Sequence, residues 1–281
     1  MLGSLLFPLL VQSALGWRAL YLVGGGLLLP LVIYWSRLRE TQRWVQEQAA
    51  PKPQGQHLPA WRQDVRLLFG PAYRGRLIAA STLWFFTCLY GIALQGFFSY
   101  YALQERGWSA ERVGLTATLG YSVAFLGYFV SGPLLDFVSR KITASVYFSL
   151  GAIAATLCFQ AQYPLAITVF YCLALAMSGV WAISATITAE IFPTHMRATA
   201  NAVANNVLDR LGCVLSPSLI GLLSSPLGSV GNAATVVVWG NVLICVPILL
   251  LLLPETRGKT LEEIAARTPA TGGNHEDRGN E

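Results

Sequence analysis

Long apolar runs separated by short polar breaks follow one another along the whole chain. The approximate limits of these runs are 1–15, 17–35, 76–103, 113–135, 142–162, 164–189, 198–223 and 232–253. A helix needs about 20 mostly apolar residues to cross a bilayer, and each run after the first is long enough. Turn residues such as Gln162-Tyr163-Pro164 mark the breaks. The pattern predicts about eight spans and therefore an all-α polytopic membrane protein.

The first run is too short for a complete span. As a helix, residues 1–15 reach only about 22 Å, whereas the hydrocarbon core of a bilayer is about 30 Å thick. The segment also lacks the basic start and the small-residue cleavage site of a signal peptide. We therefore interpret it as the remaining part of a longer helix.

The composition agrees with a membrane protein and offers little for catalysis. Hydrophobic residues make up 54% of the chain and charged residues 12%, against about 25% charged residues in soluble domains. The five cysteines all lie inside apolar runs without a CxxC pair, so we interpret them as buried free thiols. The three histidines are far apart, which predicts no metal site. Since the sequence shows neither a nucleophile–base arrangement nor a phosphate-binding loop, it predicts no enzyme, no cofactor and no ATP-driven pump.

Basic residues gather in alternate breaks. Fifteen of the 19 lysine and arginine residues lie in the segment 36–76, in Arg140-Lys141, at Arg197 or in the tail 254–281. The positive-inside rule places that segment and the tail in the cytoplasm, in a multi-pass protein of the cell membrane. Because the charges do not form one patch, the sequence predicts a lipid bilayer and no nucleic acid as partner.

One stretch between two apolar runs carries three charges. Gly132 to Lys141 reads G-P-L-L-D-F-V-S-R-K, or G-x-L-x-D-x-x-x-R-K. Charges between hydrophobic spans are costly unless they lie at the membrane surface and have partners. The stretch resembles the signature loop of the major facilitator superfamily of secondary transporters, which joins the second and third helices of each six-helix half.

Four further motifs extend this resemblance along the chain, each similar to a motif of the metabolite–proton symporter and sugar-porter branch. They are Gly16-Trp17-Arg18 for G-W-R, Glu40-Thr41-Gln42-Arg43-Trp44 for E-S-P-R-W, Glu190 to Arg197 for E-x-x-P-x-x-x-R, and Pro254 to Glu263 for P-E-T-K-G-x-T-L-E-E. The two Glu-Thr pieces echo each other, as expected of repeated halves. The order of the motifs implies that the spans correspond to helices five to twelve of the family, with helices one to four absent.

The resemblance implies an organisation in halves. Residues 1–35 are then the remnant of an N-terminal half, 36–75 a cytoplasmic central loop, 76–253 a C-terminal six-helix half and 254–281 a cytoplasmic tail. It implies a secondary active transporter of a small polar metabolite, an organic acid or a sugar, coupled to protons and working by alternating access. Two alternatives stay open. One is a truncated non-transporting membrane protein, such as a fragment, sensor or assembly partner; the other is a membrane-embedded enzyme, which would need clustered catalytic side chains.

The charged stretch suggests a conformational latch. Gly132 permits close helix packing. Asp136 is disfavoured at the end of its own helix, and the resemblance directs it toward the start of the seventh run. Arg140 then needs an acid, for which Glu190 is the best candidate. We expect Asp136, Arg140, Glu190 and Arg197 to form a cytoplasmic network beside Gly132; the alternative is that Arg140 only anchors the chain at the membrane surface.

The seventh run carries the most polar residues. Asn201, Asn205 and Asp209 recur every four residues and share a helix face, with Asn206 and Arg210 beside them. Ionisable residues inside a span are functional hypotheses. Arg210 is a candidate for binding an anionic substrate, since a guanidinium suits carboxylates, or it is a structural charge. Asp209 is a candidate proton carrier or a counter-ion to Arg210, although neighbours about 100° apart on a helix favour pairing across helices.

Polar and aromatic residues in two other runs complete the candidate substrate site. Gln95 and Tyr90 lie in the third run and Trp181 in the sixth. Such side chains are suited to lining a cavity between helices. The candidate set is Arg210, Asn205, Asn206, Gln95, Tyr90 and Trp181.

Overall fold

The described residues fall into two units. The computed structural model describes residues 15, 16, 18–35 and 60–253. The chain divides after Pro59, and each unit is described by itself. In the first unit, the second predicted run forms helix α2 (Arg18–Trp35), an apolar helix with Pro30 inside it. The expectations for residues 1–14, 36–59 and 254–281 lie outside the described residues.

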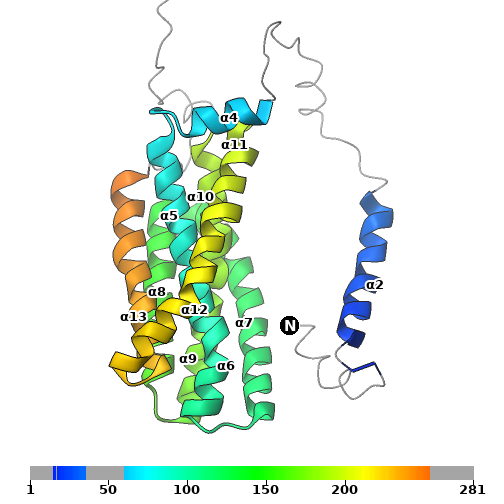
Figure 1. Cartoon of the computed structure of the whole chain (residues 1–281), viewed down its shortest axis with the longest axis vertical. Coiled ribbons are helices and arrows are strands. Elements are labelled where there is room, and N and C mark those ends of the chain that lie inside the picture. The colour runs from blue at the N-terminus through cyan, green and yellow to red at the C-terminus, as the bar shows by residue number, and fades with distance from the viewer. Residues whose placement is uncertain (1–14, 17, 36–59, 254–281) are drawn as a thin grey trace, which may run out of the picture. The chain divides into compact units, whose positions relative to one another are not determined.

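The second unit is a bundle of long helical segments (Figure 1). Six of its described segments are long and apolar enough to cross a membrane: Arg74–Glu105, Ala110–Phe137, Arg140–Gln160, Pro164–Ile191, Met196–Leu227 and Val230–Leu252. The spans predicted between residues 76 and 253 are therefore confirmed in number and order. Their ends differ from the predicted ones by a few residues, because hydropathy marks the apolar middle of a helix better than its polar ends.

The segments are built from the following helices. A short helix, α4 (Ala60–Leu68), comes before the first span, which consists of α5 (Arg74–Gly91), η1 (Ile92–Gly96), α6 (Phe97–Tyr100) and η2 (Tyr101–Glu105). The second and third are α7 (Ala110–Phe137) and α8 (Arg140–Gln160). The fourth consists of α9 (Pro164–Ala176), η3 (Met177–Gly179) and α10 (Val180–Ile191). The last two consist of α11 (Thr194–Asn201), η4 (Ala202–Leu208) and α12 (Asp209–Leu227), and of α13 (Val230–Pro247) and η5 (Ile248–Leu252). The segment η3 is 3₁₀-helical, whereas η1, η2, η4 and η5 are π-helical.

Local sequence explains where several helices begin and end. Ser109, Ser139 and Ser229 precede α7, α8 and α13, and each accepts a hydrogen bond from a backbone N–H in the first turn. Pro164 opens α9, where its missing N–H costs nothing. Gly228 ends α12 with a φ of 73°, a left-handed conformation that glycine adopts without strain.

The first span is the most enclosed one. In its most apolar window 72% of the residues are buried, against 22% in both Ala110–Phe137 and Met196–Leu227. Its helix α5 packs against α12, α13 and α10. Trp84 of α5 donates a hydrogen bond from Nε1 to Thr188 Oγ1 at 3.0 Å and packs edge-on against Trp181. Large exposed apolar faces on the second and fifth spans suit a lipid or protein environment.

Candidate functional site

An ion pair and a hydrogen bond, both made by Arg140, join three helices where α7 ends and α8 begins. The guanidinium of Arg140 contacts both carboxylate oxygens of Glu190 in α10, with Nη2–Oε1 at 3.1 Å and Nε–Oε2 at 3.3 Å. It also donates to the backbone carbonyl of Leu135 in α7. Only 15% of the arginine side chain and 19% of the glutamate side chain are exposed. The predicted contact between Arg140 and Glu190 is present, in the two-pronged geometry that strengthens such pairs.

The other two charged residues of the predicted network do not close around this pair. Asp136 Oδ1 lies 3.9 Å from Arg140 Nη2, and the aspartate side chain is 77% exposed. Within the described part of the chain, no hydrogen bond or ion pair joins Asp136 to the start of the fifth span, so the expected contact there is not found. Nε and Nη2 of Arg197 are buried and have no hydrogen-bond partner. Arg197 lies within helix α11, which begins at Thr194, and not in the loop that the motif resemblance implies.

Gly132 does not make the close helix contact expected of it. A Cβ built on Gly132 would have no atom within 4 Å, whereas a Cβ on Gly127 would lie 2.1 Å from the carbonyl oxygen of Ala176. The two glycines are five residues apart and therefore face different sides of α7. The close approach of α7 to α9 lies at Gly127, which corrects the prediction for Gly132.

Two basic residues outside the predicted set bind the ends of neighbouring helices. Arg76 Nη1 donates to the carbonyl of Ile191 at 3.1 Å, and Lys141 Nζ donates to the carbonyl of Leu250 at 3.0 Å. The last carbonyls of a helix lack helical partners and attract cations. The basic pattern indicated which end of the bundle these residues occupy, but only the packing shows which helix each one caps.

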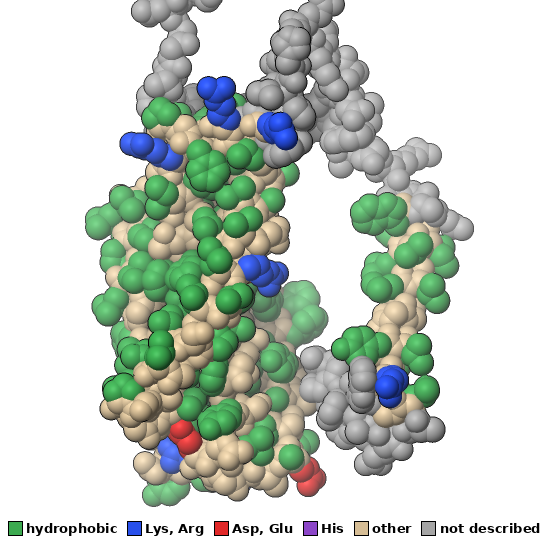
Figure 2. Space-filling model, in the orientation of Figure 1, with side chains coloured by type: hydrophobic (Ala, Val, Ile, Leu, Met, Phe, Trp, Pro, Cys, Tyr) green, Lys and Arg blue, Asp and Glu red, His purple; other side chains and the backbone are tan. Residues whose placement is uncertain are grey.

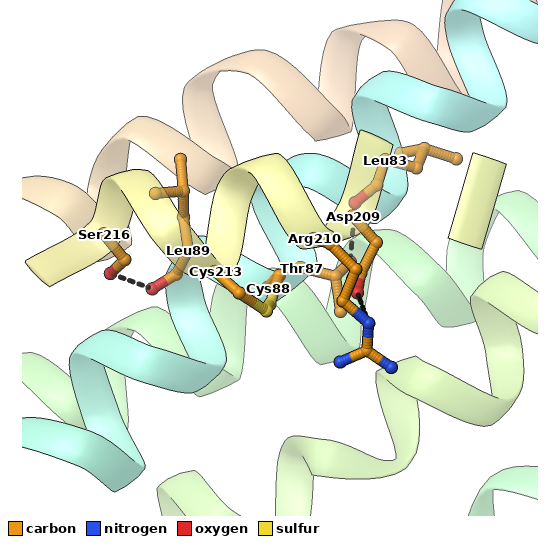
Figure 3. Close-up of a disulfide and its surroundings, with 8 residues drawn as sticks. All are labelled: Leu83, Thr87, Cys88, Leu89, Asp209, Arg210, Cys213 and Ser216. Carbon is orange, nitrogen blue, oxygen red and sulfur yellow. Dashed lines mark hydrogen bonds and ion pairs between the residues drawn. A yellow bond between two sulfur atoms is a disulfide. The ribbon is translucent and has the colours of Figure 1, made fainter. Parts of the chain in front are cut away.

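Asp209 and Arg210 lie together in the middle of the fifth span. Asp209 is fully buried, and neither of its carboxylate oxygens has a hydrogen-bond partner. The side chain of Arg210 is 66% exposed, and its Nε lies 3.9 Å from Asp209 Oδ2 (Figure 3). The expectation that pairing across helices would be favoured is wrong for the described residues, since no charged group of another helix pairs with either. The length of the arginine side chain lets it reach its neighbour despite their angular separation.

A disulfide joins α5 to α12 one turn beyond Asp209. It links Cys88 and Cys213, whose Cα atoms are 5.3 Å apart and whose positions are 125 residues apart in the sequence. The Cα separation lies in the range that a disulfide requires. The prediction of free thiols is therefore wrong for these two. It is confirmed for the other cysteines, Cys158, Cys172 and Cys245, of which Cys172 is only half-buried. Hydropathy places both bonded cysteines in spans, but it contains no information on the level at which the two helices cross.

The disulfide has a third possible ligand group beside it. One carboxylate oxygen of Asp209 and the sulfur atoms of Cys88 and Cys213 lie within 4.8 Å of one another. This grouping was not predicted from the sequence. While the two sulfur atoms are bonded to each other, neither is available as a thiolate ligand for a metal.

The polar candidates near Arg210 differ in exposure. Asn206 is exposed, and so is Arg210, which follows it by four residues in the same span. Asn205 is half-buried. Gln95, in the π-helical segment η1 of the first span, is also half-buried. Of the polar residues predicted on the fifth span, Asn206 and Arg210 are therefore the ones exposed on the surface of the bundle.

The aromatic candidates take part in core contacts. Tyr90 is buried, and its hydroxyl donates to the carbonyl of Ala174 at 2.9 Å. Trp181 is half-buried and packs against Trp84, with 5.9 Å between the ring centroids. In the described residues neither forms a hydrogen bond or ring contact with Arg210. Their placement explains how α5 is held against α9 and α10.

Comparison with known proteins gives consistent matches. A family model described as Major Facilitator Superfamily matches residues 83–273, which is more than half of the chain. The chain is 24% identical over 256 residues to the D-galactonate transporter of Escherichia coli, covering 80% of this chain and 57% of that protein. It is 30% identical over 236 residues to the probable polyol transporter 4 of Arabidopsis thaliana, covering 78% and 43%. It is 27% identical over 227 residues to the cis,cis-muconate transport protein of Acinetobacter baylyi, covering 77% and 52%. The chain thus spans about half the length of the curated relatives that it matches.

Proposed function

The chain belongs to the Major Facilitator Superfamily, and on that premise we propose that it is a secondary active transporter of a small polar metabolite, an organic acid or a sugar. It is an integral multi-pass membrane protein. Transport would proceed by alternating access, in which two helical halves rock around a central site. The relatives described above are named as transporters and not as enzymes.

The exposed guanidinium of Arg210 is the observation that carries the substrate proposal. Two thirds of this side chain is exposed on a helix able to cross a membrane. A charge in a span is costly unless it faces a partner or a water-filled cavity, and a guanidinium binds carboxylates through paired donors. Two of the relatives are named for organic acids, D-galactonate and cis,cis-muconate. We infer that Arg210 contacts an anionic substrate, with Asn205, Asn206 and Gln95 as further candidates, whereas Tyr90 and Trp181 are engaged in core contacts.

We propose that Asp209 carries the coupling proton. Its carboxyl group is buried and receives no hydrogen bond. Burying an ionised carboxylate costs far more than burying the neutral acid unless a cation lies nearby. Arg210 is that cation, at 3.9 Å. When a substrate carboxylate engages Arg210, Asp209 loses its counter-ion and takes up a proton, which couples the two binding events.

The ion pair between Arg140 and Glu190 supports the latch proposal. It connects the start of α8 to the end of α10 and is mostly buried. In the proposed cycle this contact closes in one transport state and opens in the other. Asp136 stands at its exposed edge, and Arg197 lies one turn inside α11.

The distribution of basic residues supports the proposed orientation. Lysine and arginine side chains gather at the end of the bundle that carries α4 (Figure 2). By the positive-inside rule this end faces the cytoplasm, together with the central loop 36–75 and the tail 254–281, in the cell membrane. Residues 76–253 are then the C-terminal six-helix half, and 1–35 belong to the N-terminal half.

Uptake into proteoliposomes tests the proposal. Vesicles that hold the purified chain and carry an inward proton gradient receive labelled D-galactonate, cis,cis-muconate or a polyol, and uptake of an acid above protein-free vesicles is expected. Arg210→Ala should abolish it. The control Arg112→Ala should not, because Arg112 lies at the opposite end of α7 from the ion pair, stacked on Trp108 at 4.5 Å. Normal uptake by Arg210→Ala would refute the binding role. Uptake that appears only after residues upstream of Met1 are supplied would favour the non-transporting alternative.

A further inference from the structure

The crossing of α5 and α12 is a close backbone contact in its own right. A Cβ added to Gly212 would lie 2.3 Å from the carbonyl oxygen of Phe85. One turn further along, Ser216 Oγ donates to the carbonyl of Leu89 at 3.3 Å. The disulfide lies between these two contacts (Figure 3). Because small residues already bring the helices together, the sulfur atoms stay within reach of each other when their bond is broken.

The two sulfur atoms differ in access. Cys88 is 1% exposed and lies in the core of the bundle. Cys213 is half-buried, and its neighbours Leu211 and Val214 are exposed. The exposed guanidinium of Arg210 lies on the same helix one turn away, and a charge at this depth requires a polar environment. A water-soluble reagent that enters along this face therefore meets Cys213 first.

We propose that the disulfide between Cys88 and Cys213 is a thiol–disulfide exchange site for a small dithiol, which attacks at Cys213. In its oxidised form the disulfide cross-links α12 to α5 beside Asp209 and Arg210. This exchange reaction is independent of any substrate transport by the chain.

The exchange proceeds in two balanced steps. First, a thiolate of the dithiol forms a bond to Sγ of Cys213. The bond to Cys88 breaks, its electron pair leaves on the Cys88 sulfur, and that sulfur takes up a proton. Second, the other thiolate of the reagent attacks the reagent's first sulfur, which is bonded to Cys213 in the mixed disulfide. The reagent thereby closes into a cyclic disulfide, and Cys213 leaves as a thiolate that is then protonated. The cysteine pair gains two electrons and two protons, and the dithiol loses the same.

Alkylation and mass spectrometry of the full chain test the chemistry. The protein is denatured in N-ethylmaleimide before any reductant is added, and the peptides of Cys88 and Cys213 should be recovered joined to each other. Recovery of both cysteines as alkylated thiols would overturn the proposal. A brief native treatment with the monothiol 2-mercaptoethanol, followed by acid quenching, should place the adduct on Cys213 about tenfold more often than on Cys88. Equal adducts on the two cysteines would contradict the assigned point of attack.

Hydrogen exchange tests whether the disulfide holds α5 against α12. After native treatment with dithiothreitol, amide exchange in peptides from α5 and α12 should increase by about twofold or more, while peptides from α8 stay unchanged. Unchanged exchange in all three helices would show that the bond does not hold the crossing. The matched control is Cys172→Ala, which removes a free, half-buried cysteine and should leave the response to dithiothreitol as in the unaltered protein.

Discussion

Removing the charge of Glu190 should destabilise the bundle much more than removing the charge of Asp136. At an effective dielectric constant of about 20, two unit charges 3.1 Å apart attract each other by about 5 kcal/mol. Desolvation of the two mostly buried groups cancels part of this attraction. The variant Glu190→Gln keeps an acceptor but leaves the guanidinium of Arg140, 15% exposed, without its close counter-ion. We expect a loss of about 2–4 kcal/mol in the free energy of unfolding.

Asp136 is the matched control for Glu190, because it contacts the same arginine from an exposed position. Asp136 also contacts Arg140, but at 3.9 Å and with 77% of its side chain exposed. Solvent screens such a pair, so Asp136→Asn should change the unfolding free energy by no more than about 0.5 kcal/mol. Both aspartate and glutamate lose the same charge in these variants. The difference between them therefore isolates burial and geometry from net charge.

A double-mutant cycle in mixed micelles measures the interaction. Tryptophan fluorescence follows unfolding by sodium dodecyl sulfate for the unaltered chain, Glu190→Gln, Arg140→Gln and the double variant. The coupling energy should be about 1–3 kcal/mol in favour of the native pair. A coupling energy near zero, or equal losses from Glu190→Gln and Asp136→Asn, would refute the reasoning.

Three further predictions concern other contacts. Gly212→Val should prevent stable folding because its side chain would overlap the facing backbone of α5, whereas Gly132→Val should cost less than about 1 kcal/mol. In thermal scans Gly132→Val should keep a cooperative unfolding transition and Gly212→Val should show none; a transition in both variants would contradict the clash. Asp209→Asn should abolish uptake driven by a proton gradient while leaving counterflow exchange of the same substrate; loss of both would argue against a role limited to the proton. Tyr101→Phe should cost about 1–2 kcal/mol, since its hydroxyl bridges two groups at 2.7 Å, and the exposed Tyr100→Phe should be neutral in the same unfolding assay.

The helical spans could be predicted because their signal lies within the sequence of each span. Each of the six in the second unit is a continuous apolar run of sufficient length, and polar residues such as Ser109, Ser139 and Ser229 stand where three of the helices begin. The pairing of Arg140 with Glu190 could be predicted too. A buried arginine needs an acid, and the motif resemblance limited the choice of acid.

Contacts that depend on how two helices cross could not be predicted. The disulfide between Cys88 and Cys213 depends on the level at which α5 meets α12. Hydropathy carries no information on that level. Gly127 and Gly132 are equally small, and only the rotation of α7 decides which of them meets α9. Arg197 was expected in a loop but lies in a helix, because α11 starts three residues before it. In each case the missing information is the rotation or offset of one helix against another.

The π-helical segment η4 lies between Arg197 and Asp209 and gives the fifth span a place to twist. A π-helical turn holds more residues than an α-helical turn. Its conversion to an α-helix would therefore rotate one side of the span against the other, by about 100° for each residue of offset. Deleting one residue of η4 should accordingly preserve the fold, whereas deleting one residue of α8 should not, as thermal unfolding can show. With Cys213 bonded to α5, the lower part of the span is anchored, so the rotation falls on α11. A change near the ion pair would then turn α11, with Arg197, about the axis of the span, while Arg210 in the anchored part keeps its orientation.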